Sequence, residues 1–211
     1  MGHYKMKKII LIISIIWLTF SCTLKKEDII DKIVQQENEI LNQLFCEMVF
    51  PLVPPPNDTS EIGLVSYEKE VKRIMDSIQY EIYLVDSLIV PDRSYFHNFD
   101  ISNEFQILYE KLKNESIIKP RKLDKDIFKV KSNYKLITDF KVDSTFQEKV
   151  MQHNLIGVIK FSRVSFNYDF SKACFYQSIS CGHGCGGGLF IFAERLNNRW
   201  RIVLKHLIWV S

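Results

Sequence analysis

One short segment holds the residues of this chain whose types and spacing could do chemistry. Residues 181–188 read Cys-Gly-His-Gly-Cys-Gly-Gly-Gly and contain five of the eight glycines of the protein. Glycine adopts backbone conformations that a side chain would forbid. The segment lies between two apolar runs, residues 173–180 and 189–193, and glycine-rich residues between such runs indicate a β-hairpin. We therefore predict that residues 181–188 form an irregular loop of an antiparallel sheet.

The side chains of Cys181, His183 and Cys185 leave four interpretations open. Because glycines let the loop curl, the Cα atoms of Cys181 and Cys185 can approach bridging distance, and a disulfide between them would fix the loop mechanically. Alternatively, the two cysteines and His183 could converge on zinc or copper, although the spacing is not that of a zinc finger and a fourth ligand is not evident. A nucleophilic cysteine with His183 as its base is the third interpretation. The fourth is a reduced loop without a chemical role.

Other chemistries find little support in the sequence. Phosphate binding is disfavoured because the glycines lead into a strand and no Lys-Ser or Lys-Thr pair follows them. No acidic pair stands out for glycosidase chemistry. His97 is expected to pack on neighbouring aromatic rings, His206 to be a half-exposed strand residue, and His153 has no evident partner. We therefore predict no catalytic residue and no cofactor, and we favour a non-enzymatic protein.

The loop would be positioned by a C-terminal antiparallel sheet of four or five strands at about residues 155–211. Ile159 and Phe161 alternate in phase, and the alternation resumes one residue out of step at Val164 and Phe166, which indicates a bulge near Ser162. Turn-forming residues occupy positions 167–171. Two asparagines at 197–198 are typical of a tight hairpin, since asparagine tolerates positive φ. A half-buried last strand follows and ends near residue 209.

Both strands that flank the loop carry apolar residues on both faces. On the first, Ala173 and Phe175 share a face, while Cys174 and Tyr176 point the other way. On the second, either the odd-numbered or the even-numbered residues between 189 and 193 face the core. The other set must then face something other than bulk water.

The N-terminal half is predicted to be mainly helical. Residues 27–50 have the periodicity of an amphipathic helix, in which Cys46 is expected to act as a small core hydrophobe. The prolines of residues 51–56 end this helix and predict a stiff connector, so residues 22–60 would act partly as a tether before a single domain at residues 61–211. That domain is predicted to contain helices at 66–79 and 103–113, a strand at 80–90 that could also extend the preceding helix, and a short strand at 134–138.

The first 21 residues are predicted to be a secretory signal peptide. A basic head containing Lys5, Lys7 and Lys8 precedes an apolar run too short for an ordinary membrane span, and Ser21 and Cys22 follow it. Residues 18–22 resemble a bacterial lipobox, which implies that Cys22 is acylated, for example with palmitate, and becomes the first residue of the mature protein. The alternative is an uncleaved membrane anchor.

The charge of the mature chain argues against a nucleic-acid partner. The full chain has 28 basic and 25 acidic residues. Residues 1–21 carry Lys5, Lys7 and Lys8 and no acidic residue, so the remainder has no net formal charge and no electrostatic basis for binding nucleic acid. Residues 26–28, Lys-Glu-Asp, resemble the surface-export signal of Bacteroidota lipoproteins, and the alternative is a solvated helix start. We therefore expect an outer-membrane lipoprotein, with its periplasmic or surface side left open.

The C-terminal quarter of the chain carries a further resemblance. Residues 161–167 (FSRVSFN), residues 172–173, the 181–188 segment and residues 198–202 (NRWRI) resemble the C-terminal part of a family of uncharacterised Bacteroidota lipoproteins. The family implies a membrane anchor and no activity. Helices before a curved meander also resemble cystatin-like or nuclear-transport-factor-like cones, an analogy that carries no function. We thus expect an α+β envelope protein with a binding or structural role toward a protein or glycan, the alternative being a redox or metal-binding site at Cys181, His183 and Cys185.

Overall fold

The structure is a computed structural model that describes residues 28–49, 61–114, 120–130, 132–138, 155–182 and 184–211. The expected signal peptide, Cys22, the proline-rich connector, His153 and His183 lie outside the described residues. The chain divides into two compact units, Met1–Glu39 and Ile40–Ser211. The described residues of the first unit, 28–39, are helical, and in the second unit residues 40–48 are helical.

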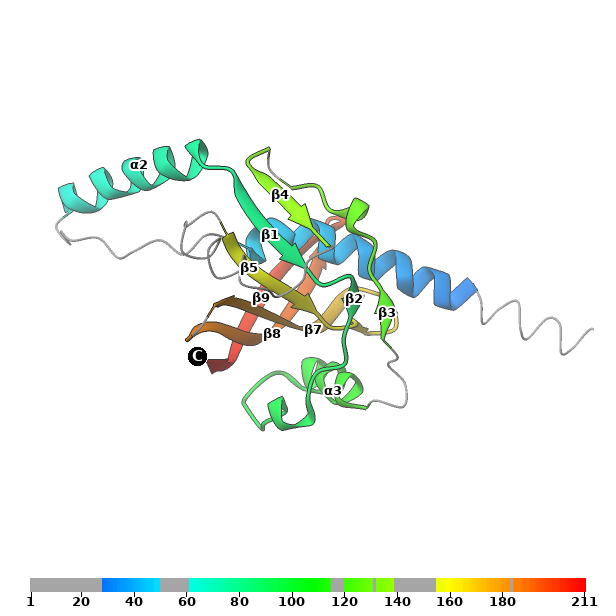
Figure 1. Ribbon diagram of the computed structural model, residues 1–211. Helices are drawn as coiled ribbons and strands as arrows, with labels where there is room; N and C mark the ends of the chain where they lie inside the picture. The colour runs from blue at the N-terminus through cyan, green and yellow to red at the C-terminus, as the bar shows by residue number, and fades with distance from the viewer. Residues whose placement is uncertain (1–27, 50–60, 115–119, 131, 139–154, 183) are drawn as a thin grey trace, which may run out of the picture. The chain divides into compact units, whose positions relative to one another are not determined.

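A mixed β-sheet forms the centre of the second unit. Along its main path the strands have the order β4-β1-β5-β7-β8-β9 (Figure 1). β1 (Tyr80–Leu84) pairs in parallel with β4 (Tyr134–Ile137) and with β5 (Leu155–Phe161). The other pairs are antiparallel and involve β6 (Ser165–Phe166), β7 (Lys172–Gly182), β8 (Cys185–Leu196) and β9 (Arg199–Val210).

The predicted α+β class is confirmed, with helices in the N-terminal part and antiparallel strands at the C-terminus. The parallel strands β1 and β4 extend the sheet beyond the predicted antiparallel meander. The predicted 80–90 strand ends at Leu84, and the chain then forms β2 (Ser87–Leu88), which pairs with β3 (Arg121–Lys122) in a separate small sheet.

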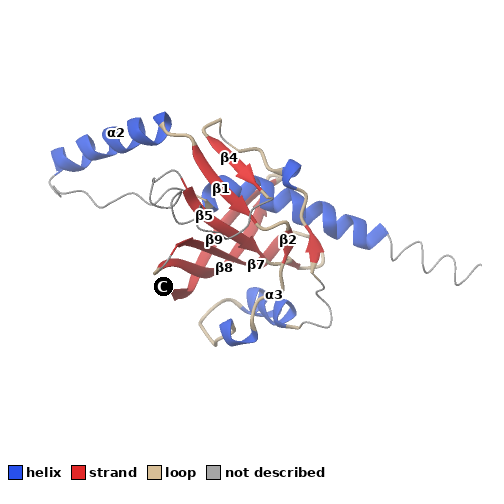
Figure 2. Cartoon of the chain, in the orientation of Figure 1, coloured by secondary structure: helices blue, strands red, loops and turns tan. Residues whose placement is uncertain are grey.

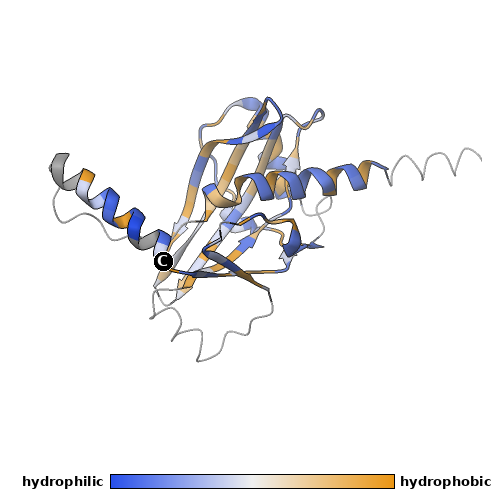
Figure 3. Ribbon diagram, turned by 90° about the horizontal axis from the view of Figure 1, so that it is seen from above, coloured by the Kyte–Doolittle hydropathy of each residue, from blue (hydrophilic) through white to orange (hydrophobic). Residues whose placement is uncertain are grey.

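Helix α3 has the predicted bounds, Asn103–Lys113, and follows the N-cap residue Ser102. Helix α2 (Glu61–Ser77) begins and ends earlier than predicted. Figure 3 shows apolar segments along the strands, whereas α2 is largely hydrophilic. None of the described helices is both long enough and apolar enough to cross a lipid bilayer.

The shift in alternation near Ser162 corresponds to an irregularity of the sheet. Phe161 pairs with Gln177 and Ser165 pairs with Cys174, so the β5-β6 side contains one more residue than β7 between the same two pairs. The backbone N–H of Ser162 donates to the carbonyl oxygen of Tyr176 at 2.8 Å, and the Ser162 hydroxyl accepts from the Tyr176 N–H at 2.8 Å. The extra residue is therefore accommodated without leaving these groups unpaired, and the predicted bulge is confirmed.

Two turns fix the register of the C-terminal strands. Asn197 and Asn198 both have positive φ, 51° and 61°, as predicted for the hairpin between β8 and β9. In the turn between β6 and β7, the Asn167 carboxamide oxygen accepts from the backbone N–H groups of Ser171 and Lys172 at 3.0 and 2.9 Å. Because a slip of one residue would exchange the two faces of a strand, these turns determine which side chains enter which core.

The two faces of β7 and β8 contribute to different hydrophobic cores. Phe175 and Ile191 belong to the larger core, which also contains buried residues of the 40–49 segment, among them Leu44. Helical residues 40–48 thus share a compact unit and a core with the strands of residues 80–211. Tyr176 and Phe190 face the opposite side of the sheet and form a smaller core with α3. Both alternating sets of β8 are therefore buried.

The smaller core is an aromatic cluster beneath α3, which lies beside β7 (Figure 2). Tyr109 of α3 contacts Phe190 edge-on with ring centroids 4.9 Å apart, and Phe105 contacts Phe192 at 5.3 Å. The Tyr109 hydroxyl donates to the backbone carbonyl oxygen of His97 at 3.1 Å. Edge-to-face packing of this kind stabilises a core beyond simple burial.

The buried phenol of Tyr109 predicts a loss of stability at alkaline pH. Burial raises the pKa of Tyr109 to about 12, compared with about 10 in the unfolded chain. The folded state therefore prefers the neutral phenol, and the stability it contributes is complete below about pH 10 and lost as the pH rises toward 12. In urea unfolding at a series of pH values, Tyr109→Phe should lose part of this decline, and at neutral pH it should cost about 1 kcal/mol for the missing hydrogen bond.

Tyr168, whose side chain is fully exposed, provides the control. Tyr168→Phe should keep both the stability and the pH dependence of the unchanged protein. If Tyr109→Phe kept the full alkaline decline, the buried phenol would not be its source.

Candidate ligand-binding site

The glycine-rich segment forms the closed end of the hairpin between β7 and β8. A disulfide joins Cys181 and Cys185, whose Cα atoms lie 5.1 Å apart. Gly182 and Gly184 have φ of 121° and 67°, values at which a residue with a side chain would be strained. The glycines thus allow the tight path that brings the two sulfur atoms together, as the first of the four interpretations expected.

The hairpin offers no thiolate to a metal or a substrate in this state. Both sulfur atoms of Cys181 and Cys185 are used in the disulfide, and His183 lies outside the described residues. Across the described segments, no group of three His, Cys, Asp or Glu side chains is arranged to hold a metal ion. The geometry supports a mechanical role for the two cysteines.

The remaining glycines of the segment shape the two faces of β8 differently. A side chain on Gly188 would collide with the Trp209 indole and the Tyr176 hydroxyl, which are joined by a hydrogen bond of 2.8 Å from Trp209 Nε1. On Gly187, by contrast, an added Cβ would meet just one described atom within 4 Å, the Trp209 carbonyl oxygen at 3.3 Å. The face of the sheet on which Gly187 lies is therefore open at this end.

An apolar pocket of about 420 Å³ occupies that open face. Ligand pockets in proteins span roughly 300–1,000 Å³. Its walls come from the ends of β7, β8 and β9, from the disulfide-closed hairpin and from the end of the 40–48 helix. The lining residues are Met48, Gln177, Ile179, Cys181, Gly184, Cys185, Gly186, Gly187, Leu189, Lys205, Leu207, Val210 and Ser211.

The pocket exists because the sheet extends past the end of the helix that covers this face. Two polar side chains mark the boundary: Gln177 Nε2 donates to the carbonyl oxygen of Met48 at 3.1 Å, and Lys205 Nζ donates to that of Glu47 at 3.1 Å. They satisfy carbonyl groups that the last turn of a helix leaves without an intrahelical partner. Beyond them, Leu207 and Val210 of β9 are 59% and 70% exposed, so apolar surface remains uncovered.

Lys205 is the only charged side chain among the described residues that line the pocket. Its ammonium group lies near the carboxyl end of helical residues 40–48, where the helix dipole favours a positive charge. The pocket thus combines largely apolar walls with one charged side chain, that of Lys205, at its margin.

The other cysteines and histidines do not contribute to this pocket. Cys174 is fully buried, and burial raises the pKa of its thiol well above the ordinary value, so it stays protonated and unreactive. Cys46 is a partly buried free thiol. His97 is exposed, whereas the ring of His206 is half-buried as predicted and stacks on Phe99 with centroids 3.7 Å apart.

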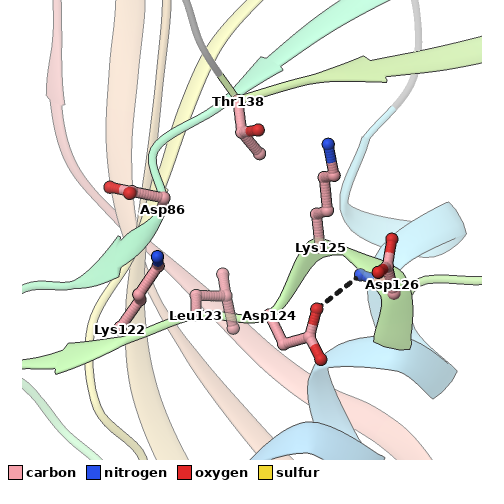
Figure 4. A pocket seen from close by; sticks show the side chains of 7 residues that line it. All are labelled: Asp86, Lys122, Leu123, Asp124, Lys125, Asp126 and Thr138. Carbon is pink, nitrogen blue, oxygen red and sulfur yellow. Dashed lines mark hydrogen bonds between the residues drawn. The ribbon is translucent and has the colours of Figure 1, made fainter.

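A second depression of about 520 Å³ is polar and has mixed charge (Figure 4). Its acidic side chains are Asp86, Asp124 and Asp126, with Lys122 and Lys125 beside them. The Asp124 carboxylate accepts from the Asp126 backbone N–H at 2.9 Å, which caps the short helical turn η2 (Lys125–Ile127). The Asp124 carboxylate therefore stabilises a local turn. The apolar pocket remains the stronger candidate for a binding site.

The sequence predicts the hairpin but not the pocket beside it. Lys205, Leu207 and Val210 could be assigned to the last strand, yet nothing in their spacing showed that they face the glycines. One signal was available, because Gln177 is a polar residue inside an apolar strand and therefore had to find a buried partner.

No family model, no curated protein and no solved structure matches this chain. The functional conclusion therefore depends on the geometry of the apolar pocket and of the hairpin that closes it.

The disulfide predicts a specific pattern of thiol reactivity. Alkylation of the denatured protein, mapped by mass spectrometry, should label Cys46 and Cys174 without reductant and should label Cys181 and Cys185 only after reduction. Replacing Cys181 and Cys185 together by serine should lower the free energy of unfolding by about 2 kcal/mol, the chain-entropy value for so short a loop. Cys46→Ser, which breaks no covalent link, should cost less. Labelling of Cys181 before reduction would contradict the disulfide.

Proposed function

We propose that the protein is a lipid-anchored, exported and non-enzymatic binding module of the bacterial cell envelope, and that the apolar pocket beside the Cys181–Cys185 hairpin is its binding site. The observation that carries this proposal is the uncovered apolar end of the sheet, where Leu207 and Val210 remain exposed beside Gly187. A concave, largely apolar site with few polar groups is typical of ligand binding.

Burial of the pocket walls would supply the binding energy. Each buried methylene group contributes about 0.8 kcal/mol, and a leucine or valine side chain roughly 1.5–3 kcal/mol when it passes from water into an apolar contact. Ile179 and Leu189 already pack partly against the larger core, so they provide a fixed wall. A ligand that covered Leu207 and Val210 would therefore bury apolar side chains that the folded chain leaves exposed to water.

The signal-like residues 1–21 and the disulfide support the proposed location in the cell envelope. The basic and apolar residues 1–21 before Cys22 have the pattern of a lipoprotein signal. Disulfides persist in oxidising compartments, which include the space beyond the bacterial inner membrane. A hairpin stabilised by Cys181 and Cys185 is consistent with that location.

Two matched substitutions on β9 test the binding site. Leu207 lines the pocket and Val203 does not, although both side chains are exposed on the same strand, at 59% and 47%. In titrations with the neutral fluorescent probe N-phenyl-1-naphthylamine, we expect saturable binding that Leu207→Asp weakens roughly tenfold or more, since the aspartate would have to be desolvated. Val203→Asp should leave the affinity unchanged. Equal effects of the two substitutions, or no saturable binding, would refute the proposal.

Lipidation is tested separately by metabolic labelling with palmitate in a bacterial host. The full chain should incorporate label and fractionate with membranes, and Cys22→Ala should abolish the incorporation. Cys46→Ala is the control, because Cys46 lies outside the leader and should not affect labelling. Undiminished label in Cys22→Ala would place the acyl group elsewhere.

A further inference from the structure

We infer that the pocket takes a single-chain amphiphile with an anionic head group, its hydrocarbon chain along the glycine floor and its head at Lys205. This inference rests on the proposed function, since it assumes that the apolar pocket binds a ligand. The further step is the chemical class of the ligand, which we infer from the shape of the pocket floor and from the position of the Lys205 ammonium group.

The floor of the pocket suits a slender hydrocarbon chain. Gly187 lies between the wall residues of neighbouring strands: it pairs with Val210 on one side and with Ile179 on the other. Because Gly187 carries no side chain on this face, the backbone of Gly186 and Gly187 forms the bottom of the channel, and Leu207 and Leu189 line it further along. A flexible alkyl chain can follow such a channel and gains about 0.8 kcal/mol for each methylene group that it buries.

The head group is indicated by the position of Lys205. The Lys205 ammonium group has three N–H donors. Among the described residues, one of these donors bonds to the carbonyl oxygen of Glu47 at 3.1 Å. That bond holds the ammonium group at the boundary between the helix end and the pocket, so less side-chain entropy is lost when an anion binds. A carboxylate or phosphate head can accept charge-assisted hydrogen bonds from the remaining donors.

The charge of the lining discriminates among amphiphiles. None of the described lining residues has a carboxylate side chain, and Lys205 supplies a positive charge. A quaternary ammonium head would be repelled there, and an uncharged sugar head would gain nothing from the charge. The pocket should therefore prefer the anionic member of a series that shares one alkyl chain.

Three amphiphiles with a dodecyl chain test this order: dodecanoate, dodecyl maltoside and dodecyltrimethylammonium, each titrated calorimetrically into the purified full chain below its micelle concentration. We expect dodecanoate to bind about tenfold more tightly than the maltoside, and the ammonium compound to bind weakest. Lys205→Gln should bring dodecanoate to the affinity of the maltoside, which itself should not change, and Lys205→Arg should restore the preference.

A pocket-filling variant shows whether the ligands occupy the channel. A Cβ added to Gly187 would meet one described atom within 4 Å, the backbone carbonyl oxygen of Trp209 at 3.3 Å, a tight contact that a small shift of β9 would relieve. Gly187→Leu should therefore fill the floor and remove saturable binding of all three compounds, and urea unfolding checks that the fold is kept. Anionic phospholipid vesicles that bind unchanged protein and Gly187→Leu equally would show adsorption to a lipid surface and would overturn the inference.

The remaining outcomes separate this inference from the proposed function. Equal binding of dodecanoate and the maltoside, or a dodecanoate preference that survives Lys205→Gln, would overturn the anionic head group and leave an apolar binding pocket. If none of the three compounds nor the neutral fluorescent probe bound saturably, the proposed function would fail together with the inference.

Discussion

The fold depends on one constraint, which is that β7 and β8 bury both of their faces. Phe175 and Ile191 enter the core shared with helical residues 40–48, while Tyr176 and Phe190 enter the aromatic core beneath α3. A slip of one residue in this pair of strands would exchange both sets at once. The disulfide-closed hairpin fixes the register between β7 and β8, and the positive-φ asparagines fix the register between β8 and β9.

The pocket lies where this two-sided burial stops. At Gly188 the space left by the missing side chain is filled by Trp209 and Tyr176, so the aromatic face remains closed. At Gly187 the space on the other face is not filled by a described side chain, and the helix has already ended. A run of glycines thus closes one face of the sheet and opens the other, which explains why a structural hairpin and a candidate binding site share the same residues.

Local sequence signals predicted the local structure of this protein well. The bounds of α3, the bulge near Ser162 and the turn at Asn197 follow from helical periodicity, strand alternation and backbone preference, and each depends on neighbours in the chain. The parallel pairing of β1 with β4 and β5 could not be predicted in this way, because parallel strands are joined by long connections and are selected by tertiary contacts. The same holds for the pocket. Two register shifts between β8 and β9 set the pairs Leu207 with Leu189 and Val210 with Gly187, and neither shift has a clear sequence pattern.

The buried thiol of Cys174 has a consequence for how the chain acquires its covalent structure. Cys181 and Cys185 are separated by four positions, so in the unfolded chain they meet about twice as often as Cys181 meets Cys174, seven positions away, and far more often than either meets Cys46. Once α3 has docked, Cys174 is enclosed and its sulfur is protonated, which keeps it from attacking the finished bond. Shuffling among alternative pairings, including Cys174 with Cys181, should therefore be confined to molecules whose aromatic core has not yet formed.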